Sequence, residues 1–272
     1  MNFNAYCLGH LSGKPEGESL TAAWSRLDIA AFPDNFITEA AAFGAEAGTT
    51  KNGFPVTGYV WTDPSMLAPL PLLDETPPVK AVLEAIEKTP PHKTVLLKVN
   101  CPYSILSSLV EPSLFYRWLR KNKKEIHAAL DTITRGLVSY MVKALHKGVK
   151  ILSLADPYAN IKILGKERYA EFAASYLVSL LAAIVNRNEL LSGIIHLCPY
   201  NSIALEELNL LTADNLRVEC TTETYIELID RYGKNNRTGR ITLAGHQCIY
   251  AKNIGKIITL TIKPAGRQPY EF

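Results

Sequence analysis

The chain has 272 residues, of which 47% are hydrophobic and 20% are charged, and its formal net charge is +3. A charge this small does not attract a polyanion, so nucleic acid is not expected as a partner. No apolar run approaches the roughly 20 residues that span a bilayer, and the first residues lack the basic and apolar regions of a signal peptide. We therefore expect a cytoplasmic protein without a membrane segment.

In chain order, the first part of the sequence is the less regular one. Residues 5–13 and 54–61 are expected to be strands, separated by a helix around residues 19–32, and Pro-rich stretches follow between residues 64 and 91. Further apolar runs, rich in Val, Ile and Leu, alternate with longer helical patterns and lie at residues 94–100, 149–156, 193–198, 216–220, 240–248 and 256–263. This alternation is typical of βα units and a parallel sheet.

The clearest helical pattern runs over residues 166–185. Its apolar residues recur at helical spacing and predict one broad face that packs on the sheet: Tyr169, Phe172, Ala173, Tyr176, Leu177, Leu180, Leu181 and Ile184. Gly148 stands where a helix end needs a residue with positive φ, directly before the strand at 149–156. Eight strands close a (β/α)8 TIM barrel, so we predict one barrel domain over residues 1–272.

In such a barrel, the carboxyl ends of the strands carry the active site. The polar residues expected at those ends are Asn100, Asp156, His196, Cys198, Glu219 and Cys248. His196 and Cys198 are two apart on one strand, so their side chains share a face. A histidine, two thiolates and a carboxylate at one barrel mouth match the ligands that Zn²⁺ prefers. The five cysteines are odd in number and widely spread, which favours reduced thiols over disulfides.

Several segments of this chain resemble one superfamily of barrel enzymes. IIHLCPYNSIALEELNLLTADNLRVECTTETYIELID, residues 194–230, resembles the His-x-Cys segment and later strand-end Glu of cobalamin-independent methionine synthase. KVNCPYSIL, residues 98–106, resembles a segment that this enzyme shares with uroporphyrinogen decarboxylase and the methylcobamide-dependent coenzyme M methyltransferases. ILSLADPYANIKILGKERYAEFAASYL, residues 151–177, is similar to the Asp-Pro segment and following helix of the corrinoid-linked members. LGHLSG, residues 8–13, is similar to the first barrel strand of related small proteins.

This resemblance implies a zinc-dependent thiol methyltransferase. Zinc would bind the acceptor thiol, lower its pKa and present the thiolate to a methyl donor, either a methylcobamide or a methyl-folate. The acceptor would be a small-molecule thiol such as homocysteine or coenzyme M, and a corrinoid protein is a further expected partner. The ligands carried over from the resemblance are His196, Cys198 and Glu219.

The resemblance also assigns residues around the metal. Asp156 would line the pocket as a catalytic residue and bind a polar group of the substrate, while Asn100 and Tyr103 would lie near the cleft floor. His10, at the end of the first expected strand, could reach the same pocket.

The sequence departs from the superfamily at its last strand. Members carry a Cys-Gly there, whereas residues 256–272 contain no cysteine. Cys248, at the end of the preceding expected strand, is the predicted replacement, and His246 on the same strand face could also serve. Pro199 stands where the family pattern His-x-Cys-Gly has glycine.

Other interpretations of these residues stay open. His196 and Cys198 fit a buried strand end, Glu219 could pair with a basic neighbour, and Asp156 before Pro157 could cap a turn. Two alternative functions follow: a divergent, non-catalytic barrel that binds a corrinoid or a small ligand, or a tetrapyrrole-type decarboxylase. The decarboxylase interpretation predicts a basic pocket and no metal.

Overall fold

The structure is a computed structural model that describes residues 28–33, 38–49, 55–187, 191–218, 224–236, 239–252 and 254–263. Four predictions concern residues outside these ranges: the first strand at 5–13, most of the helix around residues 19–32, and the site roles of His10 and Glu219.

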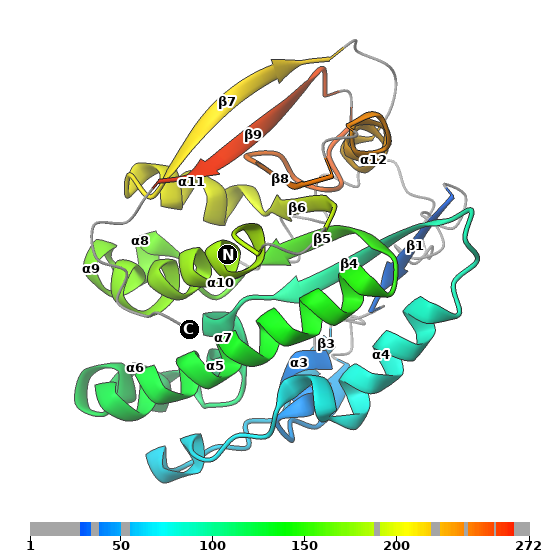
Figure 1. The fold of residues 1–272 in the computed structure, drawn as a ribbon. Coiled ribbons are helices and arrows are strands. Elements are labelled where there is room, and N and C mark those ends of the chain that lie inside the picture. Colours follow the sequence, from blue (N-terminus) through cyan, green and yellow to red (C-terminus); the bar gives the residue numbers. More distant parts are fainter. Residues whose placement is uncertain are drawn as a thin grey trace.

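A mixed sheet forms the centre of the molecule (Figure 1). Its spatial order is β1 (Ile29–Phe32), β4 (Thr94–Asn100), β5 (Val149–Ala155), β6 (Gly193–Leu197), β8 (Ile241–Gly245), β9 (Lys256–Ile262) and β7 (Leu211–Arg217). The neighbouring strands β1, β4, β5, β6 and β8 are parallel to one another, and β9 runs antiparallel to both β8 and β7. A separate antiparallel hairpin joins β2 (Ala47–Thr49) to β3 (Pro55–Thr57).

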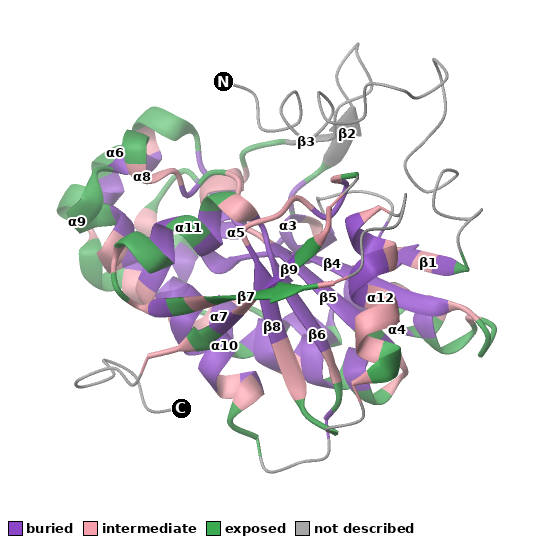
Figure 2. Ribbon diagram, turned by 90° about the horizontal axis from the view of Figure 1, so that it is seen from above, coloured by how far each residue is buried: buried purple, intermediate pink, exposed green. Residues whose placement is uncertain are grey.

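The fold is therefore of the mixed α/β class, and among the described residues the sheet is open. The expectation that residues 216–220 and 256–263 form parallel strands is wrong, because β7 and β9 pair with each other in antiparallel register. Much of β7 is exposed (Figure 2). Its exposed polar residues suit an antiparallel edge strand and could not be buried in a parallel sheet covered on both sides.

Two expectations for the first part of the chain are also wrong. Residues 29–32 form β1 and not a helix. The alanines of this segment favour a helix, but the pairing with β4 outweighs their local propensity. Residues 55–57 belong to the small hairpin and not to the central sheet. By contrast, residues 94–100 form β4 as predicted, and Gly148, with φ 105°, directly precedes β5.

Helices cover both faces of the central strands. The described helices are α3 (Thr38–Ala42), η1 (Pro64–Leu67), η2 (Leu73–Glu75), α4 (Pro77–Glu87), α5 (Pro102–Ser108), α6 (Pro112–Lys121), α7 (Lys123–His146), α8 (Ile161–Leu164), α9 (Lys166–Tyr169), η3 (Ala170–Ala174), α10 (Ser175–Val185), α11 (Pro199–Glu207) and α12 (Tyr225–Asn235). One face of the strands shares a core with α7 and α10. On the opposite face, Leu96, Ile151 and Ile194 pack with residues of α12. The residues two further along each strand therefore also point towards α12.

The helical pattern predicted over 166–185 is confirmed. It is formed by α9, a π-helical turn η3, and α10, and all of its predicted apolar face is buried. Lys166–Val185 is long and apolar enough to cross a membrane by composition, but 67% of its most apolar window is buried inside the protein. A helix packed on both α7 and the sheet has the apolar character of a core helix.

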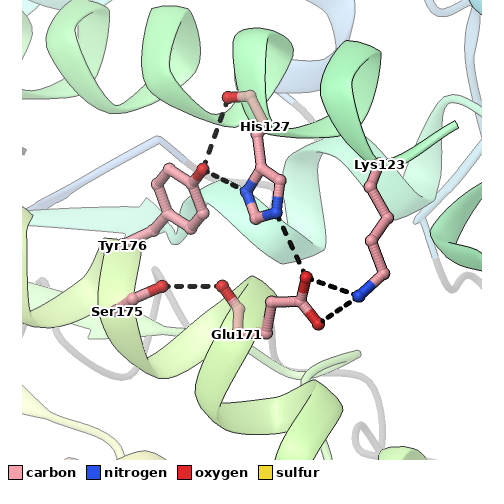
Figure 3. A network of polar contacts seen from close by, with 5 residues as sticks. All are labelled: Lys123, His127, Glu171, Ser175 and Tyr176. Atoms are coloured by element: carbon pink, nitrogen blue, oxygen red, sulfur yellow. Dashed lines mark hydrogen bonds and ion pairs between the residues drawn. The ribbon is translucent and has the colours of Figure 1, made fainter. Parts of the chain in front are cut away.

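A polar network fastens this helix to α7 (Figure 3). Lys123 Nζ lies 2.7 and 2.8 Å from the two carboxylate oxygens of Glu171, and His127 Nε2 lies 3.3 Å from Glu171 Oε1. The other ring nitrogen of His127 lies 2.7 Å from the Tyr176 hydroxyl. Because Glu171 sits within the π-helical turn, the network holds the irregular part of the helix in place.

Candidate functional site

The carboxyl ends of β4, β5 and β6 lie side by side and bring several predicted site residues together. Asn100 is in register with Ala155, and Leu154 with Leu197. The pairing continues one step beyond the strands, because the amide of Cys101 donates to the carbonyl oxygen of Ala155 at 2.9 Å. Asn100, the last residue of β4, therefore lies at the same edge of the sheet as Asp156 and Cys198, which directly follow β5 and β6.

Asp156 is the most unusual of these residues. It is 2% exposed, and its Oδ1 accepts a hydrogen bond of 2.7 Å from the backbone amide of Ser104 at the start of α5. Its Oδ2 is buried and has no partner among the described residues. Burial raises the pKa of Asp156 from 3.8 to about 7, against the opposing effect of the Ser104 hydrogen bond. The carboxyl group therefore carries a proton for part of the time at neutral pH.

Asn201 holds the backbone beneath Asp156. Its side-chain oxygen accepts from the amide of Asp156 at 2.9 Å, and its Nδ2 lies 3.4 Å from the carbonyl oxygen of the same residue. The Asn201 amide in turn donates to the carbonyl oxygen of Cys198 at 3.0 Å. Asn201, in the first turn of α11, thus links the end of β5 to the end of β6.

Asn100 faces a second buried carboxyl group. Its Nδ2 donates to Glu39 Oε2 at 3.3 Å, and Glu39, on α3, is 1% exposed. Burial raises the pKa of Glu39 from 4.5 to about 7, while hydrogen bonds to Asn100 and the charge of Lys98 lower it. The other oxygen of Glu39, Oε1, is buried without a described partner.

His196 occupies a different position from the one expected of a metal ligand. It lies on the α12 face of β6, in register with Ser153, and its ring packs edge-on against Tyr225 at a centroid distance of 5.9 Å. Nε2 lies 2.9 Å from the carbonyl oxygen of Gln247, which can only accept, so Nε2 carries the proton. Nδ1, 3.0 Å from Ser153 Oγ, then accepts from that hydroxyl. Burial lowers the pKa of His196 to about 4, so the ring is neutral near pH 7.

The thiols nearest to this edge belong to Cys101, Cys198 and Cys248. Cys198 is 7% exposed and stands directly before α11. Burial raises the pKa of Cys198 to about 12, and the charges of Cys248 and Asp156 contribute to the same direction. Burial also raises the pKa of Cys101, with further increases from the charges of Asp156, Cys198 and Glu39. The thiols of Cys101 and Cys198 are therefore protonated near pH 7.

The prediction that His246 and Cys248 lie together on a strand is wrong. β8 ends at Gly245, and His246 has a left-handed φ of 62°, which breaks the extended backbone. The His246 amide donates to Ser202 Oγ at 2.8 Å, and its Nε2 lies 3.4 Å from Glu206 Oε2 on α11. A side chain at Gly245 would collide with Ser202, since an added Cβ would lie 2.8 Å from Ser202 Cβ. The turn therefore sits tightly against α11.

Tyr103 lies in the first turn of α5 and is 2% exposed. Its ring packs edge-on against Phe115 at a centroid distance of 5.4 Å. Burial raises its pKa, and the charge of Asp156 contributes to this increase. Tyr103 is thus close to Asp156 but packs in the core.

The described residues do not fit a zinc centre as they are arranged. In His196, Nε2 carries the proton and the lone pair of Nδ1 accepts from Ser153, so neither ring nitrogen is available to a metal. No three His, Cys, Asp or Glu side chains within the described ranges are placed to hold a metal ion together. Glu219 lies outside those ranges.

Sequence reasoning missed Glu39, Ser153, Asn201 and Ser202. Asn201 and Ser202 follow the His-x-Cys segment directly, so a prediction that α11 begins at Pro199 would have placed them in its first turn. No pattern in the sequence marks Glu39 as a site residue, because the short α3 has no apolar periodicity and the contact with Asn100 joins distant parts of the sequence.

Comparison with known proteins gives a consistent result. The sequence model of the family described as uroporphyrinogen decarboxylase (URO-D) matches residues 21–246. A methylated-thiol–coenzyme M methyltransferase of Methanosarcina mazei is 29% identical over 122 residues, which cover 43% of this chain and 33% of the relative. A methylcobamide:CoM methyltransferase, MtaA, of Methanosarcina barkeri is 25% identical over 118 residues, with the same two coverages of 43% and 33%.

A solved structure of a methyltransferase from Methanosarcina mazei is similar in fold. It superposes with a TM-score of 0.56 at 22% identity, covering 88% of this chain and 73% of that one. At this identity, the likeness concerns the fold alone. The sequence matches to the curated relatives span only a third of their length.

Proposed function

Because the chain belongs to the uroporphyrinogen decarboxylase family, we propose that it is an enzyme, a methyltransferase that moves a methyl group from a methyl-corrinoid to a small thiol. The names of the relatives support methyl transfer to a thiol, and the name of the Methanosarcina barkeri relative specifies a methylcobamide donor. Methyl-folate is the less supported donor. A corrinoid protein would be the partner that delivers the methyl group, and a cytoplasmic location fits this role.

The observation that carries this proposal is the edge of the sheet where Asp156 and Cys198 directly follow two neighbouring strands, β5 and β6. Asp156 offers an unpartnered carboxyl oxygen in a buried environment, which suits binding of a polar group of the acceptor. In the proposed reaction, the acceptor thiol first releases its proton to solvent, and its sulfur then attacks the methyl carbon. The sulfur–carbon bond forms as the bond from methyl to donor breaks, and the donor keeps the electron pair.

The residues of this chain would orient the reaction. Asn201 and Ser104 fix Asp156, so its free oxygen keeps one position. His196 binds the carbonyl oxygen of Gln247 and thereby places the turn that carries Cys248. We propose Asn100, Tyr103, His246 and His10 as substrate-binding residues.

A bound zinc ion stays a prediction, and its proposed ligands are Cys198, Cys248 and Glu219. His196 could be a further ligand only after the loss of its hydrogen bond to Gln247 or to Ser153. When bound, zinc would supply an acceptor thiol of lowered pKa. Metal analysis of protein purified without chelator tests this separately from the reaction. A closed (β/α)8 barrel over one domain also stays a prediction.

The experiment compares donors. Purified protein is incubated with 2-mercaptoethanesulfonate or homocysteine and either methylcobalamin or methyl-tetrahydrofolate, and the methylated thiol is measured by mass spectrometry. We expect thioether with methylcobalamin and little with the folate. Release of carbon dioxide from a tetrapyrrole acid, without any methyl transfer, would favour the decarboxylase instead.

A further inference from the structure

Basic side chains gather on two stretches of the chain, residues 116–124 and 161–169. Together these stretches hold eight basic residues and one acidic residue, although the net charge of the whole chain is only +3. The remaining residues therefore include more acidic than basic side chains. The first stretch covers the second half of α6 and the start of α7, and the second covers α8 and α9.

The two stretches lie side by side. Lys123 Nζ, at the start of α7, lies 2.7 and 2.8 Å from the carboxylate oxygens of Glu171, two residues after the end of α9. Figures 1 and 2 both place α6, α8 and α9 on one side of the molecule. The basic residues here that are exposed and form no ion pair with a described residue are Arg117, Arg120, Lys121, Lys124, Lys162, Lys166 and Arg168. We call them the basic surface.

The sequence of α6 turns its basic side chains outward. Phe115 and Trp118 are buried against the rest of the protein. Arg117, Arg120 and Lys121 are three and four residues apart, so they are neighbours on the exposed face of the helix.

Exposed apolar side chains accompany these charges. Tyr116 precedes Arg117 on α6 and is 39% exposed, Ile163 follows Lys162 on α8 and is 65% exposed, and Tyr158, before α8, is 60% exposed. Aromatic and apolar side chains surrounded by charged ones are typical of a surface that binds another protein.

The basic surface borders the candidate site. The Tyr158 amide donates to Ser104 Oγ at 3.0 Å, and the Ser104 amide donates to Asp156 Oδ1. Burial raises the pKa of Tyr103, and the charge of Arg168 opposes this increase. Because screened charges act over about 10 Å, α9 lies close to Tyr103. A protein that docks here would therefore reach the edge of the sheet that carries Asp156.

The charges of the whole chain favour a protein over a larger polyanion. A nucleic acid or an anionic membrane would extend beyond the basic surface to the more acidic remainder of the chain, which would repel it. A protein face of limited size would meet only the basic surface. Opposite charges across such an interface speed association and orient the partners.

We propose that the basic surface is the docking face for the protein that carries the methyl-corrinoid, and that this partner meets it with an acidic face. This inference rests on the proposed methyl transfer, and it names the surface and the charge of the partner for the same site.

The first test measures binding. The full chain is immobilised, and a purified corrinoid protein of net negative charge that carries methylcobamide is passed over it, with single-stranded DNA and phosphatidylglycerol vesicles as two other polyanions. We expect the corrinoid protein to bind most tightly, and its affinity to fall as ionic strength rises from about 0.05 M to about 0.5 M, because salt screens exposed charges.

A matched pair of variants then tests the surface itself. Arg117→Glu combined with Lys121→Glu reverses two charges on α6 and should slow association of the corrinoid protein roughly tenfold or more at low salt. Lys80→Glu combined with Lys88→Glu changes the net charge by the same amount at exposed positions on and next to α4, which both pictures place away from α6. This control should leave the association rate nearly unchanged.

Methyl transfer to 2-mercaptoethanesulfonate gives a second readout. The Arg117 and Lys121 double variant should lose transfer from the corrinoid protein by a similar factor and keep wild-type transfer from free methylcobalamin, which needs no docked protein.

The outcomes separate this inference from the proposed function. No binding of the corrinoid protein, equal effects of the two double variants, or tighter binding of DNA or vesicles would overturn the docking face, whether or not free methylcobalamin is used. Salt-dependent binding that is lost only in the α6 variant would support the docking face even without methyl transfer from either donor, in which case the proposed function fails alone.

Discussion

Replacing Asp156 by Asn should make the protein more stable at neutral and alkaline pH. Burial raises the pKa of Asp156 from 3.8 to about 7. The folded state therefore holds this proton more tightly than the unfolded state, and the wild type loses stability as pH rises from about 4 to about 7. At about 1.4 kcal/mol for each tenfold change in proton affinity, the full loss is about 4 kcal/mol. Asn keeps the acceptor for Ser104 but has no proton to lose.

The assay is urea unfolding of wild type and variant between pH 4 and pH 8. The difference in free energy of unfolding should grow by about 4 kcal/mol across this range, in favour of Asp156→Asn, and become constant above pH 8. Other titrating groups, Glu39 included, are present in both proteins and cancel in the difference. Two stability curves that stay parallel from pH 4 to pH 8 would refute the reasoning, because they would mean that Asp156 titrates normally.

Four further substitutions test the structure around the site. Burial lowers the pKa of His196 to about 4, so the unfolded chain takes up a proton on this residue before the folded chain does. The wild type should therefore lose about 3 kcal/mol of its free energy of unfolding as pH falls from 6.5 to 4, and His196→Gln should lack this loss in denaturant unfolding. Gly245→Ala should lower the free energy of unfolding by roughly 1–3 kcal/mol, because the added methyl group overpacks the turn. A melting temperature equal to that of the control Gly58→Ala would contradict the tight packing of this turn. Tyr176→Phe should lower stability by about 1 kcal/mol through the lost hydrogen bond to α7, and an unchanged unfolding midpoint would count against that bond. Cys198→Ser should lower the zinc content of the purified protein, measured by elemental analysis, and full retention would remove Cys198 from the proposed ligands.

The central strands could be predicted because their signal is local. Residues 94–100 form a fully buried apolar run, and Gly148 marks the junction before β5, so sequence and structure agree there. The same local reasoning put Asn100, Asp156 and Cys198 at neighbouring strand ends. It failed for β1, where alanines favour a helix, and for β7 and β9, whose antiparallel pairing depends on contacts between distant segments.

The details of the site depended on partners that sequence does not reveal. Whether His196 is free to bind a metal depends on the carbonyl oxygen of Gln247 and the hydroxyl of Ser153, and only the fold brings these atoms to its ring. Glu39 enters the site because α3 packs beside the end of β4. Spacing along the chain can place a side chain at a strand end, but it does not show which hydrogen bonds that side chain already makes.

The most direct test of the account is transfer of a labelled methyl group. Wild-type protein is incubated with trideuteromethyl-cobalamin and a thiol, and the thioether is analysed by mass spectrometry against a reaction without protein. The account predicts a protein-dependent thioether that carries the intact trideuteromethyl group and is greatly reduced with Asp156→Asn. If the protein yields no labelled thioether above the protein-free rate with either homocysteine or 2-mercaptoethanesulfonate, it is not a methyl-corrinoid:thiol methyltransferase.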